Sequence, residues 1–403
     1  MITQNKTLDT LLIVALMMFI GIETFAKDNV ILRFNFTNGA NPHSALISDG
    51  QGNLYGTAMG GNKACYSGCG IVYELSPTSG GKWKETILNE FEQFNGGRPG
   101  ALIFGTDGNL YGTLYYQSIF QLTNVNGHPK NKIIYTFTGQ QGYSFGSQLA
   151  FDAKGNLYGS LQEDGPEYGG AVFELSPQAD GTWNATILHS FGASGDGNGP
   201  AGGVVFDSKG NLYGTTAYGG SFGYGTVFEL SPNANGSWSE SILYNFSGGG
   251  DGYPSTPLTF GPDGNLFGTT DQTAFELSQT NGAWNLTTLY IFGNQDAHGN
   301  NSSSPSGLIF DPSGNAYGVT SFGGNQCNTP GCGVVFKLAP ESGGRWKEVL
   351  LHQFESAGDG SEANFNGPAP TLLLDNSTGR LYGATIYGGD MDGDGTVFFV
   401  DTK

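Results

Sequence analysis

The sequence is poor in basic residues, with 16 Lys and Arg against 35 Asp and Glu and a formal net charge of −19. Nucleic acids and anionic membranes are bound mainly through basic patches. This shortage therefore argues against a nucleic-acid partner and against an anionic membrane surface. An acidic surface instead suits cations, neutral glycans or basic proteins.

Recognisable catalytic motifs are absent. The sequence contains no G-x-S-x-G, no H-E-x-x-H, no phosphate-binding loop and no dinucleotide fingerprint, and it has only five histidines. Hydrolases, zinc proteases and nucleotide-dependent enzymes usually carry one of these patterns. We therefore favour a binding protein over an enzyme.

Only one long hydrophobic run is present, from Leu11 to Ile22. It is shorter than the roughly 20 residues that span a bilayer. Lys6 precedes it, and Thr24-Phe25-Ala26 follows as a small-residue cleavage site. This order predicts a signal peptide over 1–26 and a mature domain over 27–403, secreted to the extracellular space or periplasm without membrane insertion after cleavage.

Cysteine is rare, with four copies in two close pairs: Cys65 with Cys69, and Cys327 with Cys332. In an exported protein four cysteines indicate two disulfides, and three pairings are possible. We favour 65–69 and 327–332, because each pair lies in one short loop at the same point of a repeat. A zinc site that uses all four thiolates is the alternative.

Glycine and aromatic residues are abundant, with 68 Gly and 13% Phe, Trp and Tyr. One phrase, close to G-N-L-Y-G-T, begins at residues 52, 108, 155, 210, 264, 314 and 379, so its spacing runs from 47 to 65 residues. A period near 50 residues is typical of β-propeller blades. The sequence therefore predicts seven blades.

Each repeat contains four strand-like segments. In the fourth repeat these are 203–207, 211–216, 226–230 and a segment within 238–246. Ser231-Pro232 is expected to end the third strand, because Pro cannot donate a ladder hydrogen bond. The last repeat stops after its third strand, at 397–400, whereas the segment 30–36 has the pattern of a fourth strand. We therefore predict an all-β, seven-bladed propeller whose N-terminal strand completes the last blade and closes the ring.

The combined pattern G-N-L-Y-G-T-T, then an aromatic residue and G-G, then G-T-V-F-E-L-S-P, resembles the bacterial GloVer tandem repeat of choice-of-anchor proteins. It is best preserved in the first, third, fourth and sixth repeats. The resemblance implies an exported repeat protein and supplies no catalytic residues.

Propeller topology places the loops between second and third strands, and those between blades, on one face. These loops are the long and variable ones, so we expect the functional site there, around the ring axis. Several carry an acidic residue beside Gly or Ala that could bind a cation or a sugar: Asp196, Asp251, Asp296 and Asp359. A simple Asp-Gly turn is the interpretation we favour for them.

Aromatic residues precede the G-G pair at Tyr218, Phe322 and Tyr387. If exposed they would stack on sugar rings, and if buried they would pack between blades, which is the outcome we favour. The five Trp residues and the repeated Tyr of the N-L-Y-G phrase are expected to be structural, because each occupies one fixed repeat position.

Asp390, Asp392 and Asp394 match the D-x-D-x-D-G start of a calcium loop. Alternate carboxylates can converge on one hard cation. An acidic version of the ordinary loop at 219–227 is the interpretation that we favour. Calcium is the only cofactor that we expect.

Two catalytic constellations are conceivable on the same face. His298, Tyr253 and Arg98 would supply a base, a phenolic acid and a carboxylate-binding cation for a lyase. Asp359 and Glu362 would supply the paired carboxylates of a hydrolase. The leading hypothesis remains a secreted propeller that binds a glycan or a surface protein. A polysaccharide lyase or hydrolase, and a purely structural module, are the alternatives.

Overall fold

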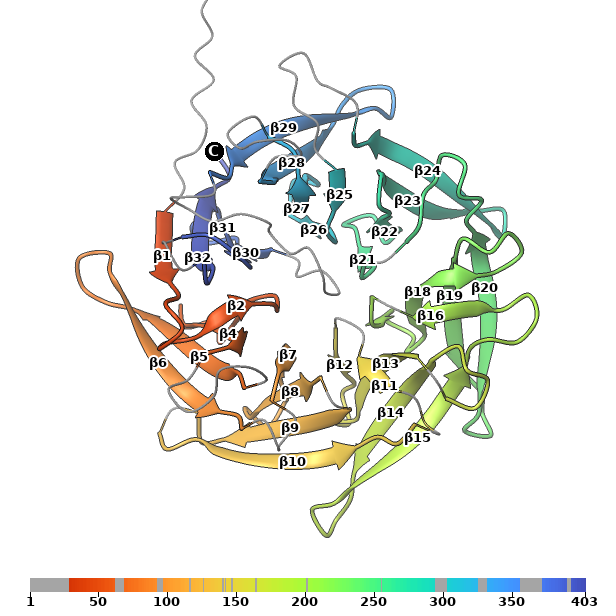
Figure 1. Cartoon of the computed structure of the whole chain (residues 1–403). Coiled ribbons are helices and arrows are strands. Elements are labelled where there is room, and N and C mark those ends of the chain that lie inside the picture. Colours follow the sequence, from red (N-terminus) through yellow and green to blue (C-terminus); the bar gives the residue numbers. More distant parts are fainter. Residues whose placement is uncertain are drawn as a thin grey trace, which may run out of the picture.

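The computed structural model describes the chain from Asn29 to Lys403, apart from residues 62–68, 93–96, 116, 126, 140, 142, 146–147, 164, 201, 255, 294–302, 325–331, 356–371 and 390–392. Within these residues all regular structure is β-strand, arranged as seven sheets around one axis (Figure 1). No helix in this part of the chain is long and apolar enough to cross a membrane. The predicted signal peptide lies outside the described residues.

The first three blades follow one another along the chain. Blade 1 contains β2 (Ala40–Pro42), β3 (Ile47–Ser48), β4 (Leu54–Gly60), β5 (Ile71–Pro77) and β6 (Trp83–Glu90). Blade 2 contains β7 (Pro99–Phe104), β8 (Leu110–Leu114), β9 (Ser118–Thr123) and β10 (Lys130–Thr136). Blade 3 contains β11 (Tyr143–Phe145), β12 (Ala150–Phe151), β13 (Leu157–Glu163), β14 (Ala171–Pro177) and β15 (Trp183–Ser190).

The next three blades repeat this order. Blade 4 contains β16 (Gly197–Pro200), β17 (Val205–Phe206), β18 (Leu212–Gly219), β19 (Thr226–Pro232) and β20 (Trp238–Asn245). Blade 5 contains β21 (Thr259–Phe260), β22 (Leu266–Thr269), β23 (Thr273–Thr280) and β24 (Ala283–Ile291). Blade 6 contains β25 (Ser303–Pro305), β26 (Ile309–Phe310), β27 (Ala316–Phe322), β28 (Val334–Pro340) and β29 (Trp346–Gln353).

Blade 7 is built from both ends of the described chain. β30 (Leu373–Asp375), β31 (Arg380–Thr385) and β32 (Thr396–Asp401) form its inner three strands, and β1 (Asn29–Arg33) pairs antiparallel with β32 as the outer strand. Phe34, directly after β1, is fully buried and packs edge-to-face on Tyr73 of blade 1. The predicted seven-bladed propeller and its closure by the N-terminal strand are confirmed.

The strands predicted for blade 4 are found in the predicted order, with two differences. The innermost strand is split into β16 and β17, and β19 continues through Pro232 instead of ending before it. Pro232 lies opposite Trp238 at the last pair of the β19–β20 ladder. A terminal strand position tolerates Pro because its missing N–H interrupts no further pairing.

The second glycine of the repeated phrase is required by packing. In all seven blades it lies directly across from an aromatic residue of the third strand, as Gly214 lies across from Phe228. A Cβ built on Gly214 would come 2.5 Å from the Phe228 ring. The six equivalent glycines show the same close approach: Gly56, Gly112, Gly159, Gly268, Gly318 and Gly383. The phrase therefore encodes a cross-strand contact that only Gly permits.

The Tyr before this glycine links neighbouring blades. It is buried in every blade, or replaced by a buried Phe in blade 5. Trp238 of blade 4 packs edge-to-face on Tyr158 of blade 3 at 6.3 Å, and Trp183 of blade 3 packs on Tyr111 of blade 2 at 5.8 Å. The predicted structural roles of the Tyr and of these Trp residues are confirmed.

In four blades, a hydroxyl residue after the same glycine forms a hydrogen bond to the next blade. Thr57, Ser160, Thr215 and Thr269 each donate a hydrogen bond to a backbone carbonyl of the following blade, at 2.9–3.2 Å. In blades 6 and 7 the position is Val319 and Ala384. The bonds are therefore useful but not required at every junction.

The turn between the first two strands is built around an aspartate. In blade 4, Asp207 accepts hydrogen bonds from the backbone N–H groups of Lys209 and Asn211, and from the side chains of Asn211 and Tyr213. Partial burial disfavours the ionised carboxyl, but these hydrogen bonds outweigh it and hold the pKa of Asp207 below its ordinary value. Asp311 of blade 6 behaves in the same way.

Gly214→Ala is expected to lower the free energy of unfolding by about 1–3 kcal/mol, because the added methyl group overlaps the Phe228 ring. Gly250→Ala is the matched control, since a Cβ there meets no atom within 4 Å. Urea unfolding monitored by tryptophan fluorescence measures both. Equal losses in the two variants would contradict the packing explanation.

Asp207→Asn is expected to destabilise the protein more at pH 7 than at pH 3. The pKa of Asp207 is lowered by folding, so its stabilisation is complete above the unfolded-state pKa and is lost as pH falls through the folded-state value. Denaturant unfolding of both proteins at the two pH values gives the difference. A destabilisation that does not shrink at pH 3 would refute this account.

Candidate functional site

The two faces of the ring are different. The turns between first and second strands, and between third and fourth strands, emerge on one face, which we call the turn face. The loops between second and third strands, and between blades, emerge on the other, which we call the loop face. In blade 4 this division follows from the antiparallel register, with Thr216 opposite Thr226 at the loop end and Leu212 opposite Leu230 near the turn end.

Exposed aromatic side chains gather on the loop face. Among the described residues, the large hydrophobic side chains classed as exposed are Tyr115, Ile133, Tyr168, Tyr218, Phe222, Tyr253, Ile291 and Tyr387. The six aromatic ones all lie in or beside loop-face loops, from blades 2, 3, 4 and 7 and the connection between blades 4 and 5. The two Ile residues lie on the rim strands β10 and β24. Single exposed apolar residues are ordinary, but this segregation is not.

The most exposed aromatic residues lie in blades 3 and 4. Tyr168 is 83% exposed, Phe222 62% and Tyr218 60%, so most of each ring faces solvent. The burial that we favoured for Tyr218 and Tyr387 is wrong, because both side chains are exposed. Tyr218 lies within β18, where it pairs with Asn198. Phe322, the third residue of that set, is partly buried.

Two of the acidic residues expected on this face are bound within their own loops. Asp251 accepts hydrogen bonds from the Ser247 backbone and side chain and from the Tyr244 hydroxyl. These hydrogen bonds outweigh burial and hold the pKa of Asp251 below its ordinary value. Asp196 contacts His189 at 3.2 Å. Asp296 and Asp359 lie outside the described residues.

His189 and Glu240 are residues that sequence analysis did not identify as site candidates. They lie with Asp196 close enough to hold one metal ion. A sequence signal existed, because the strand position of His189 is occupied by Tyr244 and Tyr290 in blades 4 and 5, and by a second His, His352, in blade 6. A change from Tyr to His at a repeated position could have drawn attention to it.

Arg98 and Tyr253, proposed above as parts of one catalytic group, have separate aromatic partners. The Arg98 guanidinium lies 5.9 Å from the ring centre of Tyr115, between blades 1 and 2. Tyr253 packs edge-to-face on Tyr224 at 5.2 Å, between blades 4 and 5. Their expected partner His298 lies outside the described residues, as does Glu362.

His43 is a histidine whose pKa is influenced by the positive charge of Arg98. It follows β2 directly, between β2 and β3 of blade 1. Burial, and to a smaller extent the positive charge of Arg98, hold the pKa of His43 below its ordinary value. The imidazole is therefore neutral at pH 7 and can accept a proton.

The calcium-loop residues can be followed only in part. Asp394 is described, and its backbone carbonyl accepts a hydrogen bond from the Asn41 N–H at 2.8 Å. Asp390 and Asp392 lie outside the described residues, so this calcium site stays a prediction. Cys69 and Cys332 are buried and neither is a free thiol. Cys65 and Cys327 lie outside the described residues, so the favoured 65–69 and 327–332 pairing also stays a prediction.

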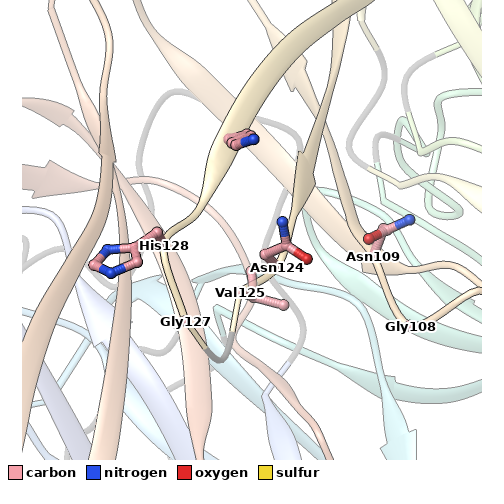
Figure 2. Close-up of a pocket in the computed structure, with 7 residues that line it drawn as sticks. Gly108, Asn109, Asn124, Val125, Gly127 and His128 are labelled. Carbon is pink, nitrogen blue, oxygen red and sulfur yellow. The ribbon is translucent and has the colours of Figure 1, made fainter.

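A hollow of about 690 Å³ lies on the turn face of blade 2 (Figure 2). It is lined by Gly108, Asn109, Asn124, Val125, Gly127, His128 and Lys130. The Asn109 side-chain amide is already held by Asp107 at 2.6 Å. The lining consists of short turns and carries none of the exposed aromatic side chains, so we assign the candidate site to the loop face.

The repeat itself is recognised by a family model. The Gloeobacter/Verrucomicrobia repeat matches residues 115–274, which run from blade 2 into blade 5. Residues 115–274 belong to the Gloeobacter/Verrucomicrobia repeat family. The predicted GloVer resemblance is confirmed, and the repeated phrase and blade geometry continue on both sides of the matched segment. No curated protein matches the sequence significantly.

Several solved structures share the fold of this protein. Virginiamycin B lyase from Staphylococcus aureus is 15% identical, with a TM-score of 0.57 over 93% of this chain and 99% of that one. The extracellular domain of a proposed hybrid two-component system from B. thetaiotaomicron is 12% identical, with a TM-score of 0.58 over 93% of this chain and 39% of that one. A proposed 6-phosphogluconolactonase from Bacteroides fragilis is 13% identical, with a TM-score of 0.53 over 88% and 97%. These proteins differ in function, so the likeness concerns the fold alone.

Proposed function

We propose that this GloVer repeat protein binds a glycan outside the cell through its loop face. The observation that carries the proposal is the segregation of exposed aromatic side chains to that face, led by Tyr168, Tyr218 and Phe222. Aromatic rings offer large apolar surfaces at low entropic cost, and Tyr adds a hydroxyl that can hydrogen-bond. The apolar faces of sugar rings fit such platforms.

Charge narrows the ligand class. The net charge of −19 disfavours polyanions such as nucleic acids or heavily sulfated glycans. The described acidic residues Asp196 and Asp251 are engaged by neighbouring groups, which leaves the exposed rings as the principal contact surface. A neutral or weakly charged glycan therefore suits this surface best.

The strands of blade 4 hold two of the exposed aromatic residues in place for ligand binding. Tyr218 lies one residue before the end of β18, and its backbone carbonyl accepts a hydrogen bond from the Thr216 hydroxyl. Phe222 lies in the adjoining loop, whose Gly220 N–H donates to the Asp196 carbonyl of the preceding connection. Tyr218 lies on a strand and Phe222 lies on a loop that strands hold at both ends, so little ordering is needed on binding.

The double variant Tyr218→Ala/Phe222→Ala is expected to weaken binding of a glycan found on an array by about 10-fold or more. Each stacking contact contributes roughly 0.5–1.5 kcal/mol and each 1.4 kcal/mol is a tenfold change. Isothermal titration calorimetry gives the affinity. Ile291→Ala, which removes an exposed side chain of the rim strand β24, is the matched control and should bind normally. An array without any bound glycan, or an unaffected double variant, would reject the proposal.

A polysaccharide lyase or hydrolase acting at the same face is the second candidate. It is favoured by His43, whose pKa is lowered by burial and by the positive charge of Arg98. The neutral imidazole could act as a base, and the Arg98 guanidinium could bind a substrate carboxylate. The similarity in fold to a protein named virginiamycin B lyase is compatible with a reaction on such a scaffold.

Mass spectrometry of a polysaccharide panel incubated with the protein tests this second candidate. New fragments that disappear with His43→Ala but persist with His128→Ala would support it, because His128 lies on the opposite face. Fragment masses would separate elimination from hydrolysis. Intact polymers throughout, or fragments that survive His43→Ala, would rule out this use of His43.

A further inference from the structure

We propose that His189, Asp196 and Glu240 bind a small divalent transition-metal ion such as Zn²⁺ at the junction of blades 3 and 4. His189 Nε2 lies 3.2 Å from Asp196 Oδ2 and 3.6 Å from Glu240 Oε2, and all three ligand atoms lie within 4.8 Å of one another. Tetrahedral ligands at about 2.1 Å from zinc are separated by roughly 3.4 Å. The two measured separations lie on either side of that value.

The three side chains come from elements that hold them in place. His189 lies one residue before the end of the rim strand β15 of blade 3, and Glu240 lies near the start of β20, the rim strand of blade 4 (Figure 1). The His189 ring packs edge-to-face on Phe191 at 4.6 Å. The Asp196 N–H donates to the Ala193 carbonyl, which closes a turn around that residue. A site on two rigid strands and a closed turn needs little rearrangement to take an ion.

Glu240 supplies the observation that points to a ligand. Its Oε1 atom is buried and has no hydrogen-bond partner. Burial, opposed by His189 and reinforced by Asp196, raises the pKa of Glu240 to about 7. A buried carboxylate oxygen without a donor is costly, and a cation relieves that cost directly. The exposed fractions of the three side chains are 22%, 8% and 15% for His189, Asp196 and Glu240, so water can reach only part of the group.

The same junction elsewhere in the ring shows what these positions hold without a metal site. Between blades 5 and 6 the equivalent residues are Tyr290 and Glu348, joined by a hydrogen bond of 2.7 Å. At the junction between blades 4 and 5, the Tyr244 hydroxyl donates a hydrogen bond to the Asp251 carboxylate. Replacing the Tyr by His189 removes a hydroxyl donor and places an imidazole nitrogen between two carboxylates. Blade 6 also has a His at this strand position, His352. Among the described residues, the junction of blades 3 and 4 is the one where such a His lies with two carboxylates close enough to hold a metal ion.

The donor set selects the class of ion. One imidazole and two carboxylates suit zinc and related transition metals, and three protein ligands leave a fourth position for water. Calcium prefers six to eight oxygen ligands. His189 and Glu240 lie on rim strands, whereas Asp196 lies in a loop-face connection whose backbone carbonyl accepts a hydrogen bond from the Gly220 N–H. The zinc proposal rests on these three side chains and does not depend on the proposed glycan binding.

Zinc binding is tested by titrating ZnCl₂ into the metal-free full chain without an affinity tag, using calorimetry and thermal unfolding. We expect a site whose occupation raises Tm by about 3 °C when free zinc is 100 times Kd. His189→Tyr should fold normally, because Tyr occupies the equivalent position in blades 4 and 5, and should lose this site. Glu240→Gln, which keeps the shape of the side chain, should lose most of the affinity.

Glu348→Gln is the matched control, since it alters the equivalent residue of blade 6 and should leave the zinc response intact. Calcium and magnesium chlorides should give no comparable shift that depends on His189. An unchanged zinc response in both His189→Tyr and Glu240→Gln, or no binding by the unaltered chain at millimolar zinc, would overturn the proposal. The three residues would then form only an ion pair between a protonated His189 and its two carboxylate neighbours.

Discussion

The close approach of a glycine to an aromatic ring, repeated in every blade, is the contact on which the rest of the fold depends. With no side chain at Gly214, the Phe228 ring can occupy the space over the strand, where it packs against Phe191 at 5.0 Å on the side of blade 3. The neighbouring Tyr213 then points towards blade 5, where it meets Phe260 edge-to-face. The hydroxyl of Thr215 reaches the Thr256 backbone of the same blade. Three consecutive residues thus pack one blade and join it to the next.

This arrangement leaves the loop face free to vary. The core contacts are made within the sheets and between neighbouring blades. The loops beyond the G-G pair therefore contribute little to the packing of the core. Tyr168, Tyr218 and Phe222 can therefore remain in solvent without weakening the ring. The same freedom allows the blade 3–4 junction to exchange a Tyr–Glu hydrogen bond for a His and two carboxylates.

The repeat pattern predicted the architecture well because each position has one physical role in all copies. Leu and Tyr of the phrase are buried, its glycines turn or permit close packing, and the missing fourth strand of the last repeat is supplied by β1. The exposure of Tyr218 and Tyr387 was not predicted, because an aromatic residue before two glycines is compatible with a buried and with an exposed position. Only the packing of the folded chain around each side chain decides between the two.

The sequence by itself determined the all-β class, the number of blades and the closure of the ring, since these follow from local periodicity and from counting strands. The tertiary structure alone decided which side chains meet. His189 and Glu240 are 51 positions apart and belong to different blades, and they become neighbours only because adjacent rim strands cross at the blade junction. A contact of that kind has no local signal in the chain, because it depends on how one folded sheet packs against the next.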